Sequence, residues 1–371
     1  MSAVFVLNAG SSSLKFQLVD PATAEVHAAG TVERIGEQGG VPDHEAAVRQ
    51  ALTSIEGKPQ PVAVGHRVVH GGDRFDAATP VTPEVEQAID DLSALAPLHN
   101  PANLQGIRAA KAVLDVPQVA VFDTAFHRTI PEAAATYAIP ADLAREHQVR
   151  RYGFHGTSHQ YVSRATASFL DIPLEGSRII VLHLGNGASA CAVLGGRSVD
   201  TSMGMTPLEG LVMGTRSGDI DPAAIFHLHR QAGMGFDELE SMLNRSSGLK
   251  GLTGTGDMRD VQAAAADGDE AAATALAVYR HRLRHYIGAY LAELGGLDAL
   301  VFTAGVGEND ALLRRTTIEP LGHLGLRVDD ARNESSSREA RRISPDHSPV
   351  AVLVVPTNEE LEIARQTAAV V

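Results

Sequence analysis

A glycine- and serine-rich segment near the start of the chain has the composition of a phosphate-binding turn. Residues 8–16 read NAGSSSLKF and lie between two runs of β-type residues, 4–7 and 16–19. The segment offers backbone N–H groups and three hydroxyls, followed by the ammonium group of Lys15. Backbone amides give directional donors to a phosphate, and a nearby lysine adds a point charge. The segment therefore predicts a phosphate site.

A second segment of this kind lies in the other half of the chain. The apolar run 178–184 leads into GNGAS at 185–189, and a further apolar run follows at 190–194. The GxGxxA spacing matches a relaxed dinucleotide fingerprint, but that fingerprint requires a helix after the glycines, and here we expect a hairpin. The P-loop pattern GxxxxGK[ST] is absent. The two turns together predict two phosphate grips on one nucleotide.

Strand-like and helix-like segments alternate around these turns, which predicts the α/β class. In the first half we expect strands at 4–7, 16–19, 62–69 and 118–122, and helices near 43–55, 83–96 and 101–114. In the second half we expect strands at 178–184, 190–194, 297–303 and 350–355, and helices near 220–231, 236–244, 258–266, 269–294 and from about 358.

The two halves share one plan, which favours an ancient duplication. Each begins with a glycine-turn hairpin, and each later has an apolar strand that ends in a polar motif, 122–124 in the first half and 303–307 in the second. A chain of 371 residues fits two lobes. We expect an N-terminal lobe at 1–150 and a C-terminal nucleotide-binding lobe at 151–359, with the last helix, about 360–371, packing back on the first lobe.

Composition narrows the class of partner. The net charge of −14 argues against nucleic acid and anionic membranes as main partners. No apolar run approaches the roughly 18 residues of a membrane helix. The first residues enter a strand without a basic leader, and the single cysteine, Cys191, excludes an intrachain disulfide, so we expect a cytoplasmic protein. The sixteen histidines are scattered, and we interpret pairs such as His227 and His229 as structural rather than as metal ligands.

Five strings of residues together resemble the acetate kinase (acetokinase) family. They are 8–15 (NAGSSSLK), 66–72 (HRVVHGG), 151–159 (RYGFHGTSH), the block from 200–204 through 214–219, and 305–309 (GVGEN). The resemblance covers nearly the whole chain. It implies the sugar kinase/Hsp70/actin superfamily fold, with two duplicated ribonuclease H-like lobes around a nucleotide cleft, and a homodimer. Two departures are Asp73, where the family pattern suggests Glu, and a shorter region between 20 and 60.

The activity that this resemblance implies is reversible, Mg²⁺-dependent phosphoryl transfer from ATP to acetate, giving acetyl phosphate and ADP. Such transfer requires mainly positioning and stabilisation of negative charge. The resemblance implies that Arg67 holds acetate, that Arg216 spans acetate and the transferring phosphoryl group, and that His155 donates a hydrogen bond to that group. The family often labels Asp123 as a proton donor or acceptor. Acetate is already ionised at pH 7, so we interpret Asp123 as organising Mg²⁺, directly or through water.

The remaining site residues are also implied by the resemblance. The acyl pocket is expected to be a small apolar wall with His99 near it: Val69, Leu98, His99, Phe154 and Pro207. Metal contacts are expected from Asn8 and Glu359, with Mg²⁺ as the metal and Mn²⁺ as an alternative. The nucleotide contacts expected on ATP or ADP are Ser11, Ser13, Lys15, His183, Leu184, Gly185, Asn186, Gly187, Asp257, Met258, Arg259, Gly305, Val306, Gly307, Glu308 and Asn309.

Other functions stay open at this level. A propionate or broader short-chain acyl kinase would share these motifs, and a pyrophosphate-dependent variant would differ only in its donor. A nucleotide-gated binding module, as among actin- and chaperone-like proteins, would lack a small-acid site. Acetate-dependent formation of ADP distinguishes the binding module from the kinases, a series of acids distinguishes the acyl kinases, and replacing ATP with other donors tests the pyrophosphate variant.

Overall fold

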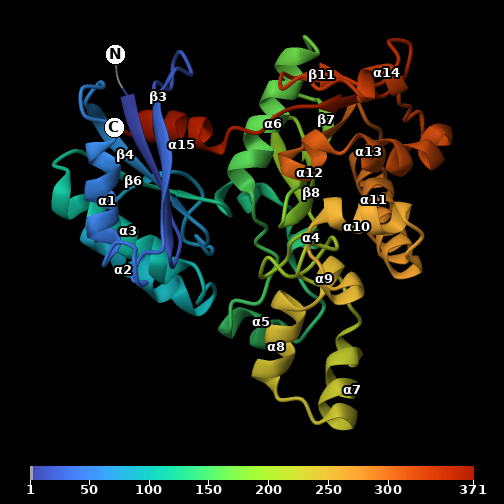
Figure 1. The fold of residues 1–371 in the computed structure, drawn as a ribbon, viewed down its shortest axis with the longest axis horizontal. Coiled ribbons are helices and arrows are strands. Elements are labelled where there is room, and N and C mark those ends of the chain that lie inside the picture. Colours follow the sequence, from blue (N-terminus) through green and yellow to red (C-terminus); the bar gives the residue numbers. More distant parts are fainter. Residues whose placement is uncertain (1–2) are drawn as a thin grey trace. The chain divides into compact units, whose positions relative to one another are not determined.

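The computed structural model describes residues 3–371 and divides into two compact units (Figure 1). The first unit holds the described residues up to Arg128 together with Phe154–Tyr161 and Asn358–Val371. The second holds Thr129–Gly153 and Val162–Thr357. The border expected at residue 150 therefore differs from the observed division, because residues 129–150 belong with the second unit. Residues 154–161 return to the first unit, where the N–H of Gly156 donates to the carbonyl of Asp123 at 2.9 Å.

The first unit is built on a six-stranded mixed sheet with the order β3-β2-β1-β4-β6-β5. Strand β1 pairs antiparallel with β2 and parallel with β4, and β4 pairs parallel with β6. The strands are β1 (Ala3–Ala9), β2 (Ser13–Val19), β3 (Val26–Glu33), β4 (Pro61–Val68), β5 (Thr79–Pro80) and β6 (Gln118–Phe122). The helices of this unit are α1 (His44–Thr53), α2 (Pro83–Asp91), α3 (Asn100–Val113) and α15 (Glu359–Ala368), with the start of α6 (Gly156–Phe169).

Both faces of this sheet are buried, and alternation along β1 shows how. Ala3, Phe5 and Leu7 pack in one cluster with residues of α1 and α3. Val4 and Val6, which point to the other face, pack with the buried side of α15. The C-terminal helix thus belongs to the core of the first unit, as Figure 1 shows for α15 beside the blue strands. Two buried faces explain why β1 reads as a continuous apolar run.

The second unit repeats this topology with the order β9-β8-β7-β10-β12-β11. Strand β7 pairs antiparallel with β8 and parallel with β10, and β10 pairs parallel with β12. The strands are β7 (Arg178–Leu184), β8 (Ala188–Leu194), β9 (Arg197–Thr201), β10 (Ala299–Thr303), β11 (Arg341–Arg342) and β12 (Ala351–Val354). The helices are α4 (Glu132–Ala135), α5 (Ala141–Glu146), α7 (Pro222–Ala232), α8 (Phe236–Arg245), α9 (Gly248–Thr253), α10 (Met258–Ala266), α11 (Glu270–Leu294), α12 (Ala304–Asn309), α13 (Ala311–Ile318) and α14 (Asp330–Asn333), besides the rest of α6.

The matching strand orders confirm the predicted α/β class and the duplication, but they correct how the halves correspond. The order of motifs in the sequence matches the end of β6, at Asp123, with the end of β10, at Thr303. In the sheets, β10 takes the place of β4, since each lies parallel beside the first hairpin strand. Strand β6 corresponds to β12 instead. The equivalent of the 303–307 motif is therefore the end of β4, just before the HGG segment.

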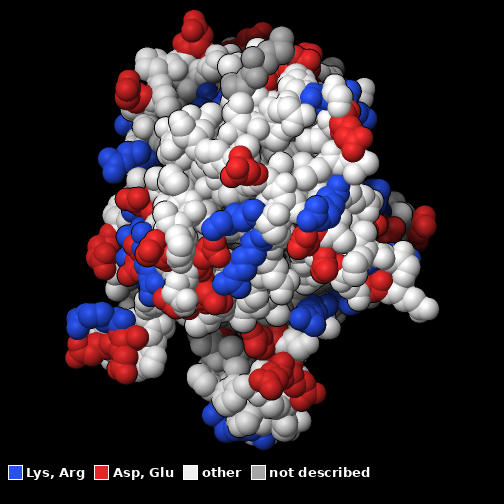
Figure 2. Space-filling view, turned by 90° about the vertical axis from the view of Figure 1, so that its left-hand side faces the viewer, with Lys and Arg blue, Asp and Glu red and all other residues white. Residues whose placement is uncertain are grey.

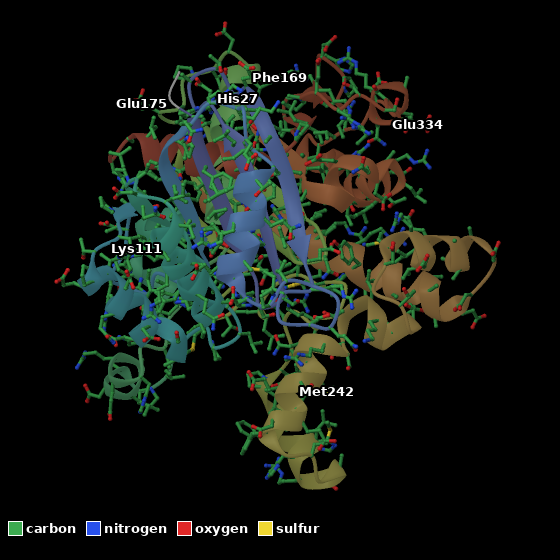
Figure 3. The ribbon with its side chains drawn as sticks, turned by 60° about the vertical axis from the view of Figure 1, so that its left-hand side comes forward. His27, Lys111, Phe169, Glu175, Met242 and Glu334 are labelled. Atoms are coloured by element: carbon green, nitrogen blue, oxygen red, sulfur yellow. The ribbon has the colours of Figure 1, made fainter. Side chains whose placement is uncertain are left out.

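The outer surface carries side chains of both charges, and helix α7 and the start of α8 are exposed to solvent. Acidic and basic side chains alternate over the face in Figure 2. Helix α7 has no buried residue, and the side chains of Phe226 and Phe236 are 52% and 65% exposed at α7 and the start of α8. Met242 marks α8 in Figure 3. Among the described residues, no helix is long and apolar enough to cross a membrane.

Candidate active site

The first turn forms a closed hairpin end that opens onto a cavity. Gly10 donates its N–H to the carbonyl of Ser13 at 2.8 Å, and Asn8 lies opposite Lys15 in the β1–β2 register. Opposite residues share one face of a sheet, so Lys15 lies beside Asn8. Lys15 is exposed and lies outside the lining of the cavity.

That cavity, of about 260 Å³, lies wholly within the first unit. Several of the predicted site residues line it together: Asn8, Ser11, Ser13, Arg67, Val69, Leu98 and His99. Gly10, Ser12, Ala9 and Asn103 complete the lining. Val69 is 6% exposed, whereas Leu98 is 57% exposed. Of these two apolar lining residues, only Val69 is therefore held in place by buried packing.

Arg67 and Asp123 form a two-point ion pair beside this cavity. Nε of Arg67 donates to Oδ1 of Asp123 at 3.1 Å, and Nη2 donates to Oδ2 at 2.5 Å. Nη1 of Arg67 reaches Oδ1 of Asn8 at 3.4 Å. Asp123 is 1% exposed, and the Arg67 side chain is 21% exposed. The edge of the guanidinium formed by Nε and Nη2 is therefore held by Asp123, and Nη1 lies near Asn8, which also lines the cavity.

Charge and burial act in opposite directions on this pair. Burial raises the pKa of Asp123; Arg67 lowers it and Glu359 raises it again, with a net pKa of about 6. Burial alone would lower the pKa of Arg67, but Asp123 and then Glu359 raise it above its usual range. Arg67 stays charged, and Asp123 titrates close to neutrality.

The loop at 154–157, within the RYGFHGTSH string, lies against Asp123. His155 adopts a left-handed backbone conformation with φ +57°, which is uncommon for a side chain of this size. At Gly156 a Cβ would lie 2.2 Å from the carbonyl oxygen of Asp123, so no larger residue fits there. Oγ1 of Thr157 donates to Oε2 of Glu359 at 3.1 Å. These contacts bring His155, Asp123 and Glu359, which are far apart in sequence, into one region of the first unit.

Two asparagines on α3 support this site, and sequence reasoning missed them. Asn103 donates to the carbonyl of Ala9 at 2.7 Å and accepts from the N–H of Val69 at 3.0 Å. Asn100 binds both the N–H and the carbonyl of His70, at 3.1 and 3.0 Å. The string HNPAN at 99–103 contained the signal, but Asn-Pro also marks an ordinary turn.

Phe154 is buried, and its ring meets His70 edge-on at 5.5 Å, so it supports the HGG segment instead of lining the cavity. Pro207 belongs to the second unit, where its carbonyl accepts from Nη1 of Arg216 at 2.8 Å. Burial lowers the pKa of Arg216. Among the described residues no carboxylate lies within 4 Å of the Arg216 guanidinium, so its charge is available to a ligand.

The second unit holds its own, larger cavity of about 680 Å³, within the usual range for small-molecule sites. Eight of the predicted nucleotide contacts line it: Gly185, Asn186, Asp257, Met258, Arg259, Gly305, Val306 and Asn309. Asp257 caps α10 by accepting from the N–H of Arg259 at 2.9 Å and also pairs with the Arg259 side chain at 2.6 Å. Gly214 is required here because a Cβ would lie 2.4 Å from Oδ1 of Asn186.

Five of the nucleotide contacts predicted in the second unit are not among the residues that line this cavity. Leu184 is fully buried, on the opposite face of β7 from His183. Oε1 of Glu308 accepts from the N–H groups of Ala304 and Thr357 at 2.9 and 3.1 Å, so this carboxylate joins the ends of β10 and β12. His183, Gly187 and Gly307 also lie outside the lining, although Gly187 and Gly307 directly follow the lining residues Asn186 and Val306 in sequence.

The second turn is a hairpin, as predicted, and not the start of a helix. Leu184 pairs with Ala188 across β7 and β8. The dinucleotide alternative therefore lacks the helix that would hold its pyrophosphate.

Known protein sequences similar to this chain include acetate kinases. The chain matches the Acetokinase family over residues 3–365. It is 62% identical to the acetate kinase of Clavibacter michiganensis subsp. michiganensis, covering 100% of this chain and 99% of that protein. The acetate kinase of Leifsonia xyli is also 62% identical, over 99% of this chain and 98% of its own length.

Solved structures of related kinases superpose on this chain over its whole length. The crystal structure of Porphyromonas gingivalis acetate kinase superposes with a TM-score of 0.95 at 41% identity, covering all of both chains. A propionate kinase from Francisella tularensis superposes with a TM-score of 0.94, also at 41% identity and full coverage. The resemblance seen in the sequence is thereby confirmed: this chain belongs to the acetokinase family.

Proposed function

We propose that this chain transfers the γ-phosphoryl group of ATP reversibly to acetate, giving acetyl phosphate and ADP. The observation that carries the choice of acceptor is the small cavity of about 260 Å³, which both Arg67 and Val69 line. One fixed cation beside one short apolar wall suits a short carboxylic acid. Family membership supports the kinase reaction.

In this proposal Arg67 binds the acetate carboxylate through Nη1, because Asp123 holds its other edge. A carboxylate oxygen attacks the γ-phosphorus, the bond from that phosphorus to the oxygen of ADP breaks, and no proton is transferred. Arg216, which has no ion pair among the described residues, neutralises charge on the transferring group, and His155 donates a hydrogen bond to that group. Arginine suits this task because its planar fork matches carboxylate and phosphoryl oxygens.

The nucleotide is proposed to bind with its adenosine in the cavity of about 680 Å³. Asp257, Arg259 and Asn309 supply polar groups there, and the glycines at 305 and 256 let the backbone approach the base and ribose. Ser11, Ser13 and Lys15 from one turn, and residues 183–187 from the other, are the proposed phosphate contacts.

The reaction is proposed to use Mg²⁺, with Mn²⁺ as a substitute. The described residues hold no group of three or more His, Cys, Asp or Glu placed for a metal. Mg²⁺ normally takes one or two protein oxygens and keeps waters and substrate phosphates as its other ligands, so Asn8 and Glu359 fit it. When bound, the metal would neutralise phosphate charge. Both carboxylate oxygens of Asp123 are occupied by Arg67, so we assign Asp123 to anchoring Arg67, with any contact to the metal through water.

The test is acyl phosphate formation, trapped with hydroxylamine, across two-, three- and four-carbon acids with ATP and Mg²⁺. We expect acetate to give the highest kcat/KM and propionate a value roughly 10- to 200-fold lower, because one methylene in a small apolar pocket is worth about 1–3 kcal/mol. The propionate kinase among the structural relatives makes this series the important comparison.

The substitution Val69→Ala sharpens that test. It should raise kcat/KM for propionate relative to acetate, since it removes two methyl carbons from the buried wall of the cavity. Val113→Ala, on the far end of α3, is a matched control because Val113 lies outside the cavity. Equal kcat/KM for all three acids in the unaltered protein would contradict the proposed pocket.

We further propose a cytoplasmic homodimer. Helix α7 without a buried residue, and exposed Phe226 and Phe236, support a contact between copies of this chain at α7 and α8. In the double variant Phe226→Ser and Phe236→Ser, the molecular mass measured by sedimentation should fall from twice 39.1 kDa towards 39.1 kDa. Phe169→Ser is the control, because Phe169 on α6 is 44% exposed and lies elsewhere (Figure 3). A double variant that remains dimeric would exclude this surface.

A further inference from the structure

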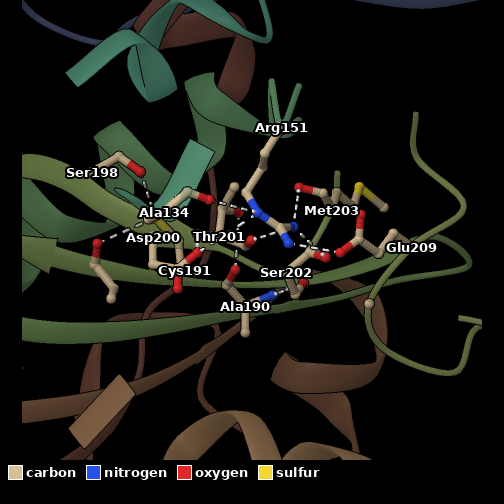
Figure 4. Close-up of polar contacts among 12 residues, drawn as sticks. Ala134, Arg151, Ala190, Cys191, Ser198, Asp200, Thr201, Ser202, Met203 and Glu209 are labelled. Carbon is tan, nitrogen blue, oxygen red and sulfur yellow. Dashed lines mark hydrogen bonds and ion pairs between the residues drawn. The ribbon is translucent and has the colours of Figure 1, made fainter. Parts of the chain in front are cut away.

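Arg151, the first residue of the RYGFHGTSH string, is a buried hub that the proposed reaction does not use directly (Figure 4). Its side chain is 15% exposed. Nη1 lies within hydrogen-bonding distance of three successive carbonyls, those of Thr201, Ser202 and Met203, at 3.0, 3.3 and 3.1 Å. Nη2 donates to Oε1 of Glu209 at 2.6 Å. One guanidinium therefore holds both ends of the segment 201–209.

A second set of contacts closes this segment from the other side. The hydroxyl of Tyr137 donates to Oε2 of Glu209 and accepts from the N–H of Met205 at 3.1 Å. The carbonyl of Gly204 accepts from the N–H groups of Tyr152 and Gly153, at 3.0 and 3.2 Å. A Cβ at Gly204 would lie 1.7 Å from Oε2 of Glu209. The segment 201–209 is thus held from outside by the side chains of Arg151 and Tyr137, which meet its own Glu209, and by the backbone N–H groups at 152–153.

The segment ends in the contact that holds Arg216. Pro207 accepts from Nη1 of Arg216 at 2.8 Å, and this is the only side-chain hydrogen bond that Arg216 makes among the described residues. Without an ion pair, the guanidinium of Arg216 is directed mainly by where the Pro207 carbonyl lies. Pro207 lies between the two parts of the segment that Arg151 binds, the carbonyls at 201–203 and the carboxylate of Glu209. The chain downstream is held separately, since Asp219 accepts from the N–H of Gly210 at 2.8 Å and from Tyr286 at 2.8 Å.

We propose that Arg151 is a positioning residue for phosphoryl transfer: through the segment 201–209 it sets the place of the Arg216 guanidinium and of the Pro207 ring. This inference rests on the proposed function. A purely structural Arg151 would affect every property of the second unit alike. A positioning Arg151 affects the steps that depend on Arg216 and leaves nucleotide binding unchanged.

The experiment compares Arg151→Lys and Tyr137→Phe. Lysine keeps the charge but has no fork to reach the carbonyls and Glu209 together. Phenylalanine removes only the hydroxyl that joins Glu209 to Met205. We expect kcat with acetate to fall about 10- to 100-fold in Arg151→Lys, which breaks several contacts with the segment at once, and about 3- to 10-fold in Tyr137→Phe, which removes one hydrogen bond from a carboxylate that Arg151 still holds. The Kd of MgADP, measured by calorimetry, should stay within about twofold.

Tyr152→Phe is the matched control. It removes a hydrogen bond to the carbonyl of Gln148, at 2.7 Å, next to Arg151 but outside the segment. It should change kcat less than twofold. If Arg151→Lys and Tyr137→Phe leave kcat and the KM for acetate unaltered, or if they weaken MgADP as much as they slow turnover, the proposal is wrong.

A double substitution separates the positioning role from additive damage. In the Arg216→Lys background, Arg151→Lys should cause little further loss, because the two act through one contact. Losses that multiply would overturn the inference. Acetate-dependent ADP formation by the unaltered protein is measured first. Its absence would refute the proposed function, whereas activity that is insensitive to Arg151→Lys would refute only this inference.

Discussion

Replacing Arg67 with alanine is expected to lower kcat/KM for acetate by roughly 10² to 10³, because removing one charge-stabilising group from an active site typically costs about 3–4 kcal/mol of transition-state stabilisation. The ion pair with Asp123 is largely buried, so the same substitution should also lower the stability of the fold. The substitution removes the proposed acetate ligand and leaves Asp123 uncompensated. Initial rates of acetyl phosphate formation over a range of acetate concentrations measure the effect.

Two further variants define what the Arg67 result means. Arg67→Lys keeps a charge but cannot bond both oxygens of Asp123 while presenting a third donor, so it should recover only part of the loss. Arg74→Ala removes an exposed pair with Asp91, at 2.9 Å, just beyond the HGG segment, and should leave kcat/KM nearly unchanged. If Arg67→Ala loses thermal stability but keeps its kcat/KM for acetate, Arg67 is structural and the acceptor site lies elsewhere.

The sequence predicted four strands of each sheet, β1, β2, β4 and β6 in the first and β7, β8, β10 and β12 in the second, because each of these has a short apolar run between turn residues. Its repeated hairpins also indicated a duplication. It did not predict β3, β9 or α6, whose residues alternate weakly or mix polar and apolar types, or the two-residue strands β5 and β11. The correspondence between halves was wrong for a related reason. Which strand lies beside the first hairpin is set by parallel pairing between distant segments, and motif order alone does not reveal that pairing.

For the site, the motifs predicted which residue types are present better than where their side chains point. Asn8, Arg67 and Val69 line one cavity, as the strings suggested. Leu184 and Glu308 belong to equally informative strings, yet one is buried in the core and the other joins two strand ends. Asn100 and Asn103 act on the backbone of segments that are remote in sequence, so no local pattern could assign them. Direction and long-range support depend on register, which the fold supplies.

Asp123→Asn should remove an acid limb from the pH profile of kcat/KM. The pKa of Asp123 is raised to about 6, first by burial and then by Glu359, against the opposing effect of Arg67. As the pH falls through 6 the carboxylate takes up a proton and its two-point hold on Arg67 is lost. We therefore expect kcat/KM for acetate to fall about tenfold per pH unit below 6 in the unaltered protein. In Asp123→Asn it should be low and flat over the same range.

Asp200 provides the control for this limb, because burial raises its pKa to about 6 as well. It lies 4.0 Å from Nε of Arg151 and far from Arg67 in sequence. If the limb persists in Asp123→Asn and disappears in Asp200→Asn, the titrating group is Asp200 and the Asp123 assignment is wrong.

Metal dependence separates the two roles considered for Asp123. An anchor for Arg67 predicts a raised KM for acetate with an unchanged Mg²⁺ requirement. A sharply raised Mg²⁺ requirement would instead assign Asp123 to the metal. Because both of its oxygens already bind Arg67, we expect the first result.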